Sequence, residues 1–123
     1  METPPATTVK MTSGTTIHAA GKQAFRMFLR PGCEAEYRRR HDEIWPELSA
    51  LLRRGGLSDY SIYLDGSTGT LFAVQRRAAD FDADALSRDP VMLAWWRHMA
   101  PLMLTHADGS PVVEPLPCVF HLE

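Results

Sequence analysis

One histidine and a group of aromatic rings are the side chains of this chain best suited to chemistry. In the stretch EYRRRHDEIWPEL, Tyr37 and His41 stand four residues apart, so a helix would place both on one face. Trp45 and Leu48 continue the same stripe. Imidazole has a pKa near 6.5, so His41 can take and return a proton at neutral pH. The alternative is a hydrogen-bonded core histidine, which is the commoner role for a lone histidine on an apolar face.

Further aromatic and histidine candidates lie later in the chain: Tyr60, Tyr63, Trp95, Trp96, His98 and His121. Adjacent residues on a helix point about 100° apart, so Trp95 and Trp96 cannot both face the core. We therefore expect at least one indole to line a cleft. Indole and phenol faces pack well against the C–H faces of sugars and similar molecules. The set favours proton transfer on a small neutral ligand, while Tyr63, His98 and His121 are interpreted as structural.

Several other kinds of site are not indicated by the sequence. The histidines show neither an HExxH motif nor another metal-ligand spacing, so we expect no metal site. Cys33 and His41 are eight residues apart and do not share a helix face, which argues against a thiolate–imidazole nucleophile. The glycines of RRGGLS are interpreted as a helix stop and not as a phosphate-binding loop.

Length and composition describe an ordinary small globular protein. The chain has 123 residues, is 45% hydrophobic and carries a formal net charge of −2. The near balance of charge argues against nucleic-acid binding. The arginine pairs such as Arg76 and Arg77 are interpreted mostly as solvated faces, with a basic binding patch as the lesser alternative. No apolar run approaches the roughly 18 residues of a membrane span. Two distant cysteines, Cys33 and Cys118, without a preceding signal peptide predict free thiols in a cytoplasmic protein.

The elements that must position the candidate residues follow from hydrophobic periodicity. Residues 1–22, rich in Thr, Pro, Ala and Gly, predict a flexible tail, and residues 23–123 predict one domain. Alternating apolar residues predict three strands, the last two joined as a hairpin around DGSTG: residues 24–30, 57–65 and 70–77.

Two helices and a final strand complete the predicted domain. A helix after PGC should run to Arg54, end at Gly55 and Gly56, and be kinked near residues 42–46 by Pro46. Residues 80–89 have helical character, and Asp89 followed by Pro90 predicts the start of another helix. The last strand is placed at residues 115–123 and at a sheet edge, because it holds two prolines.

The predicted order is strand, helix, strand, strand, helix, strand. This is the α+β, ferredoxin-like β-α-β-β-α-β arrangement, in which helices cover one face of an antiparallel sheet. The other face needs a cover, which commonly comes from a second copy, so we expect a homodimer.

Five segments of the chain resemble, in the same order, the L-rhamnose mutarotase family: EYRRRHDEIWPEL, DYSIYLD, LFAV, WWRHM and GSPV. The resemblance covers about residues 24–123. It implies a dimeric α/β-barrel of ferredoxin-like subunits that interconverts the α and β anomers of L-rhamnose without a metal or organic cofactor. The competing interpretation is a sugar-binding or sensing module that has the same fold but catalyses no reaction, since fold alone does not decide function.

The resemblance also implies roles for particular residues. The histidine of the YxRRH motif, here His41, would be the proton donor. The sugar-binding positions would be Tyr37, Tyr60, Trp95 and Trp96. The chain departs from the family pattern at its N-terminal tail, and at His121, where some members have tyrosine. If that last position approaches the pocket, the sugar preference would differ.

Overall fold

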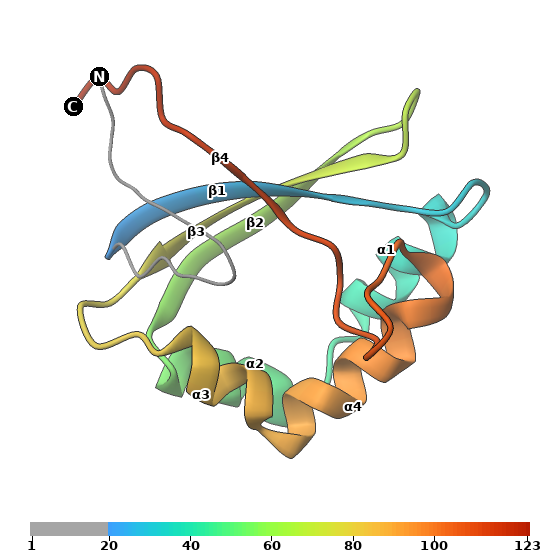
Figure 1. Cartoon of the computed structure of the whole chain (residues 1–123), viewed down its shortest axis with the longest axis horizontal. Helices are drawn as coiled ribbons and strands as arrows, with labels where there is room; N and C mark the ends of the chain where they lie inside the picture. The colour runs from blue at the N-terminus through green and yellow to red at the C-terminus, as the bar shows by residue number, and fades with distance from the viewer. Residues whose placement is uncertain (1–19) are drawn as a thin grey trace.

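The computed structural model describes residues 20–123, and the predicted tail falls almost entirely outside them. The elements follow in the order β1 (Gly21–Phe28), α1 (Glu34–Asp42), α2 (Pro46–Arg54), β2 (Leu57–Asp65), β3 (Thr70–Arg77), α3 (Ala83–Arg88), α4 (Pro90–Met99), the 3₁₀ turn η2 (Ala100–Leu102) and β4 (Glu114–Leu116). The strands pair antiparallel in the order β2-β3-β1-β4. The helices lie together on one side of this sheet (Figure 1). The predicted α+β architecture is confirmed.

The single kinked helix predicted up to Arg54 is wrong, because the chain forms two separate helices. α1 ends at Asp42 and α2 begins at Pro46, with Trp45 in an extended conformation between them (φ −64°, ψ 132°). A proline disfavours helical geometry in the residue before it, but it fits the first position of a helix. Pro46 therefore ends one helix and starts another, and α1 is left as a short element of nine residues.

The sheet differs from prediction at its two ends. β1 begins at Gly21, so it includes two residues assigned to the tail. The last strand was placed at residues 115–123, which is wrong. Only Glu114–Leu116 pairs with β1, and residues 117–123 are exposed and lie outside any strand. Pro115 and Pro117 remove the N–H donor from two of three successive residues, which stops the ladder. β4 does lie at the sheet edge, as predicted.

The predicted hairpin of β2 and β3 is confirmed, and it contains a bulge. Ser58 lies opposite Arg76 and Ser61 lies opposite Val74. Asp59 and Tyr60 therefore face Gln75 alone, which is the two-against-one arrangement of a β-bulge. Asp59 has a φ of 46°, a left-handed conformation that aspartate tolerates better than most residues. The bulge keeps Tyr60 on the inner face of the sheet, toward the helices.

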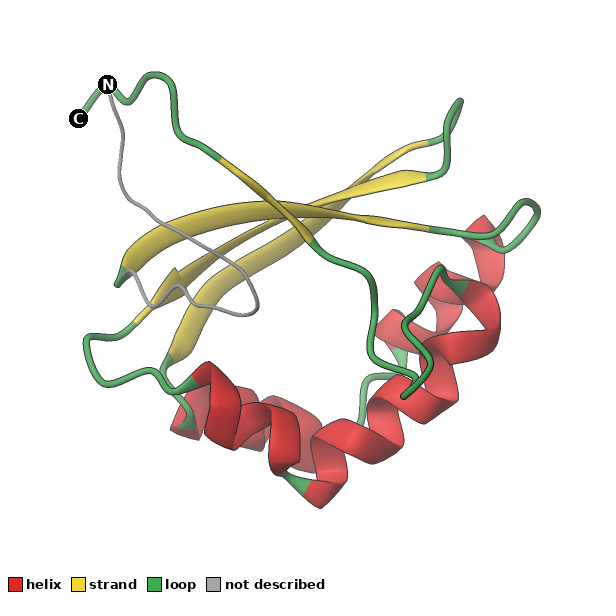
Figure 2. Cartoon of the chain, viewed as in Figure 1, coloured by secondary structure: helices red, strands yellow, loops and turns green. Residues whose placement is uncertain are grey.

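The core lies between the helices and the inner face of the sheet. Its buried residues come from the strands, α1, α2, α4 and the segment around η2: Phe25, Met27, Leu29, Tyr37, Leu48, Leu51, Leu71, Ala73, Met92, Trp95, Met99, Leu102 and Met103. In residues 20–123 the outer face carries no helix, as Figure 2 shows. Phe72 and Tyr63 form a cross-strand pair there and are 36% and 62% exposed. Among the same residues, no helix has the length and apolar character to cross a bilayer.

Candidate active site

A cleft of about 1330 Å³ lies between the helices and the inner face of the sheet. All five residues that the sequence singled out for chemistry or binding line it: Tyr37, His41, Tyr60, Trp95 and Trp96. They come from α1, the β2 bulge and α4, which are distant in sequence. The fold thus brings together every predicted site residue.

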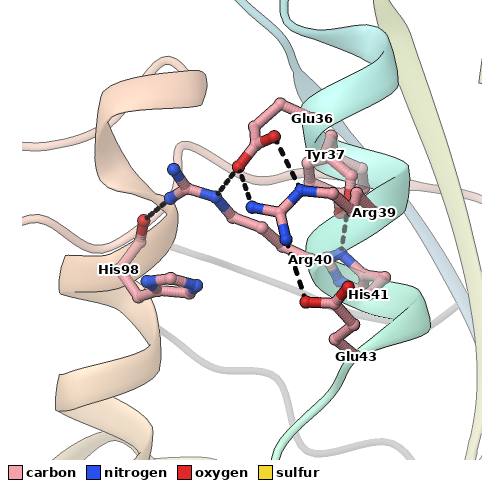
Figure 3. Close-up of polar contacts among 7 residues, drawn as sticks. All are labelled: Glu36, Tyr37, Arg39, Arg40, His41, Glu43 and His98. Carbon is pink, nitrogen blue, oxygen red and sulfur yellow. Dashed lines mark hydrogen bonds and ion pairs between the residues drawn. The ribbon is translucent and has the colours of Figure 1, made fainter.

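The His41 ring is held by a hydrogen bond and by two neighbouring rings. Its Nδ1 lies 3.2 Å from the carbonyl oxygen of Tyr37, one helical turn earlier (Figure 3). A carbonyl oxygen can only accept, so Nδ1 carries the hydrogen and Nε2 of the neutral ring is left with its lone pair. The imidazole stacks on the Tyr37 ring at 4.3 Å and meets the Trp95 ring edge-on at 5.3 Å. His41 is therefore fixed in orientation with one nitrogen free to accept a proton.

Burial sets the protonation of the cleft residues. Burial lowers the pKa of His41, while its bond to the Tyr37 carbonyl and the charge of Asp42 oppose the shift. The ring is thus neutral at pH 7. Burial also raises the pKa of the Tyr37 phenol above its usual value, with a further contribution from Tyr60.

Tyr60 behaves in the same way although part of it is exposed. Burial raises the pKa of its phenol to about 12, against the lowering effect of Arg77. The residue as a whole is 38% exposed and lines the cleft. Both tyrosines are protonated at neutral pH and can donate hydrogen bonds.

The two adjacent tryptophans occupy different surroundings, as predicted. Trp95 is 5% exposed, belongs to the core and packs edge-on against Trp45 at 5.1 Å as well as against His41. Trp96 is only partly buried and lines the cleft. Trp95 thus connects the core to His41. Trp96 has more of its surface exposed in the cleft, where a ligand could contact it.

Charged contacts hold α1 in place (Figure 3). Glu36 accepts hydrogen bonds from Nε of Arg39 at 3.0 Å and from Nε of Arg40 at 2.6 Å, and these bonds lower its pKa to about 2. Arg40 also donates to the carbonyl oxygen of His98 near the end of α4. Arg40 therefore ties the helix that carries His41 to the helix that carries Trp95.

Two residues of β3 that sequence reasoning missed also line the cleft. Gln75 is 3% exposed, and its Oε1 accepts a hydrogen bond from Nε of Arg77 at 2.7 Å. The interpretation of Arg77 as a solvated residue is wrong, because it is half-buried on the inner face. The alternation of β3 could have indicated this, because Gln75 and Arg77 fall on the same face of the strand as the buried Leu71 and Ala73.

Two further candidate histidines do not line the cleft. His98 packs against the rings of Trp45 and Trp95 at 5.4 and 5.6 Å, which fits its structural interpretation. His121 is exposed in the segment after β4, so it is not part of the core. Cys33 and Cys118 are free thiols. Within residues 20–123, no three His, Cys, Asp or Glu side chains cluster as they would to hold a metal ion.

The chain is similar to known proteins along most of its length. A family model described as L-rhamnose mutarotase matches residues 22–122. The L-rhamnose mutarotase of Verminephrobacter eiseniae is 62% identical over 102 residues, which are 83% of this chain and 96% of that protein. The L-rhamnose mutarotase of Leptothrix cholodnii is 60% identical over the same shares of the two chains.

A solved structure agrees with these similarities. The crystal structure of an L-rhamnose mutarotase from Formosa agariphila superposes with a TM-score of 0.78 at 41% sequence identity. The alignment covers 85% of this chain and all of that one.

Proposed function

The chain belongs to the L-rhamnose mutarotase family, and we propose that His41 carries the proton transfers of its reaction. The protein is an isomerase that interconverts the α and β anomers of L-rhamnose. The observation that supports the role of His41 is its geometry: a neutral imidazole, oriented through Nδ1, with Nε2 free in an aromatic-walled cleft.

Mutarotation needs one proton moved between two oxygens of the sugar. Nε2 of His41 takes the proton of the anomeric hydroxyl at O1. The C1–O5 bond then breaks, its electron pair goes to O5, and the imidazolium returns the proton to O5. The open-chain aldehyde rotates about C1–C2, and ring closure by the reverse steps gives the other anomer. A group of this kind contributes about 10²–10⁴-fold as a general acid–base. Every step is a proton transfer or a ring opening or closure, so we propose that neither a metal nor an organic cofactor takes part.

The aromatic residues are proposed to bind the sugar. Trp95 and Trp96 offer flat faces to the C–H face and the methyl group of L-rhamnose. The phenols of Tyr37 and Tyr60 stay protonated and donate hydrogen bonds to sugar oxygens. Their hydroxyls also keep the sugar oriented while the ring is open.

We further propose that two copies join through the outer faces of their sheets to form a dimeric α/β-barrel of ferredoxin-like subunits. The uncovered pair of Phe72 and Tyr63 supports this, because large aromatic side chains on a bare sheet face mark an interface. Sedimentation should give a dimer at micromolar concentration, and Phe72→Glu should shift it toward monomer. A stable wild-type monomer would contradict the proposal.

The only partners we propose are L-rhamnose and this second copy, without nucleic acid or membrane. The free thiols favour a cytoplasmic location.

The limits of the domain are also a proposal: a tail up to residue 22 and a domain from 23 onward, with β1 starting slightly earlier, at Gly21. The family match from residue 22 supports it. Deleting residues 1–19 should leave the melting temperature and the activity unchanged. A large loss of either would show that this segment packs on the domain.

Saturation-transfer NMR on L-rhamnose tests the function directly. An enzyme transfers saturation between the two anomeric protons faster than buffer does, whereas a non-catalytic sugar-binding module would bind the sugar and leave the exchange rate at the buffer value. We expect exchange that rises in proportion to enzyme concentration.

A further inference from the structure

Apart from the aromatic residues Tyr37 and Trp95, Gln75 is the one buried side chain with a polar group among residues 20–123. Its Oε1 accepts from Nε of Arg77 at 2.7 Å. A guanidinium can only donate, so the amide oxygen must face Arg77 and the amide nitrogen must point elsewhere. That nitrogen makes no hydrogen bond to any residue from 20 to 123. A buried donor without a partner is unusual in a folded protein and calls for an acceptor that binds there.

Arg77 is in a similar position. It is half-buried and forms no ion pair with an acidic side chain in the described part of the chain, while its guanidinium lies over the Phe81 ring at 4.9 Å. Its neighbour Arg76 points to the outer face, is 53% exposed and approaches Asp59 at 3.9 Å. Only Nε of Arg77 is used by Gln75, so its terminal nitrogens have donors left for a ligand.

These two residues continue the polar part of the cleft. The bulge in β2 leaves Tyr60, together with Asp59, opposite Gln75, and Tyr60 lines the cleft beside it. Tyr60 lies close enough to Tyr37 to add to the rise in the pKa of that phenol, and Arg77 lies close enough to Tyr60 to lower its pKa. A polar strip therefore crosses the cleft, from the helices to the sheet, in the order His41, Tyr37, Tyr60, Arg77 and Gln75. The other residues of the cleft that belong to the core are apolar.

We propose that Gln75 and Arg77 donate hydrogen bonds to ring hydroxyls of the bound sugar and so determine which sugars the enzyme accepts. This rests on the proposed function of the cleft. At the helix end His41 acts on O1 and O5, and at the sheet end Nε2 of Gln75 and the terminal nitrogens of Arg77 hold hydroxyls on the far carbons. A site built to bond a hydroxyl discriminates strongly against analogues that lack it, because its buried donors are then left unpaired.

Exchange kinetics on deoxy sugars test this. Wild type, Gln75→Leu and Arg77→Met are compared on L-rhamnose and on its 2-, 3- and 4-deoxy forms. Gln75→Leu should raise KM for L-rhamnose by about tenfold and change kcat far less, since a binding contact is lost. For the deoxy sugar that lacks the contacted hydroxyl, wild type and variant should have equal KM. Arg76→Met, on the outer face of the same strand, is the control and should match wild type on all four sugars.

Gln75→Glu covers the case in which leucine prevents folding. The glutamate keeps the shape and the bond to Arg77 but removes the amide donor, so it should show the same KM increase and the same loss of discrimination. An unchanged KM in a folded variant, or an equal KM increase on all four sugars, would overturn the proposal. Gln75 and Arg77 would then serve the structure and not sugar recognition. Wild-type exchange of L-rhamnose at the buffer rate would instead overturn the proposed function itself.

Discussion

The two helices that touch each other beside the cleft, α1 and α4, are held in place by different forces. α1 buries one side chain, Tyr37; the ion pairs around Glu36 lie within the helix, and the bond from Arg40 links it to α4. α4 buries Met92, Trp95 and Met99 and is fixed by apolar packing. The proposed proton carrier is on the polar helix, and the principal aromatic wall is on the apolar one.

Because of this difference, substitutions on α1 should affect mainly catalysis, whereas substitutions at the buried positions of α4 should also affect stability. A side chain on α1 can be changed with little loss of core packing, because only one of the nine residues is buried. A change at the buried positions of α4 removes core contacts and site contacts together. The following variants test the contrast, beginning with the largest expected effect on exchange.

His41→Ala should bring anomer exchange close to the buffer rate, a loss of about 10²–10⁴-fold, because the proton carrier is gone. The fold should survive, since the ring is only partly buried. Saturation-transfer NMR on the folded variant measures the loss. His98→Ala is the matched control, because it removes an imidazole that also packs on Trp95 but does not line the cleft. That variant should keep most of its activity, and equal losses in both would assign the effect to packing.

Trp95→Ala and Trp96→Ala should differ in how much stability and how much sugar binding each one loses. Trp95 is buried, so its removal should lower the free energy of unfolding by about 3–5 kcal/mol, together with activity. Trp96 is only partly buried, so its removal should raise KM while the free energy of unfolding falls less. Chemical denaturation and exchange kinetics on both variants give the two quantities. If both lose stability and binding to the same degree, the division between them is wrong.

Arg40→Met should give the smallest effect, a several-fold decrease in kcat with KM nearly unchanged. Arg40 is a positioning residue that fixes α1 against α4, and small displacements of a catalytic group are costly. Arg39→Met is the control, because Arg39 also pairs with Glu36 and its other partner is Glu43, the residue that follows α1. Arg39→Met should match wild type, since exposed ion pairs contribute little. An equal decrease in both variants would show that the charge of α1 matters and not the contact between the helices.

Much of the fold follows from local patterns in the sequence. The hairpin follows from alternation around DGSTG, and Asp89 caps α4 as predicted by accepting from the N–H of Val91. The sequence predicts a kink at Pro46 and not a break, because the periodicity continues across it; the extended conformation of Trp45 is what separates the two helices. The last strand was predicted too long, because its apolar residues fit a strand while its prolines prevent pairing.

The sequence predicts only those site residues that belong to a motif or share a helix face. The spacing of Tyr37 and His41 gave their shared face, and the adjacency of Trp95 and Trp96 gave their different surroundings. Sequence reasoning misses Gln75 and Arg77 because a polar pair at a strand end is usually solvated, whereas here both lie on the inner face of the sheet and line the cleft. The bond from Arg40 to His98 joins residues 58 apart, and nothing local in the sequence indicates it.

The central claim is that neutral His41 accepts the first proton, and a pH series on one sample tests it most directly. The titration of the His41 ring is followed by NMR, and enzyme-catalysed exchange is measured at the same pH values after subtraction of the buffer rate. Burial lowers the pKa of His41, so the midpoint should lie below the usual value of about 6.5. Exchange should fall as pH decreases through that same midpoint, because the protonated ring cannot accept. Exchange that stays constant while His41 becomes protonated would contradict the account.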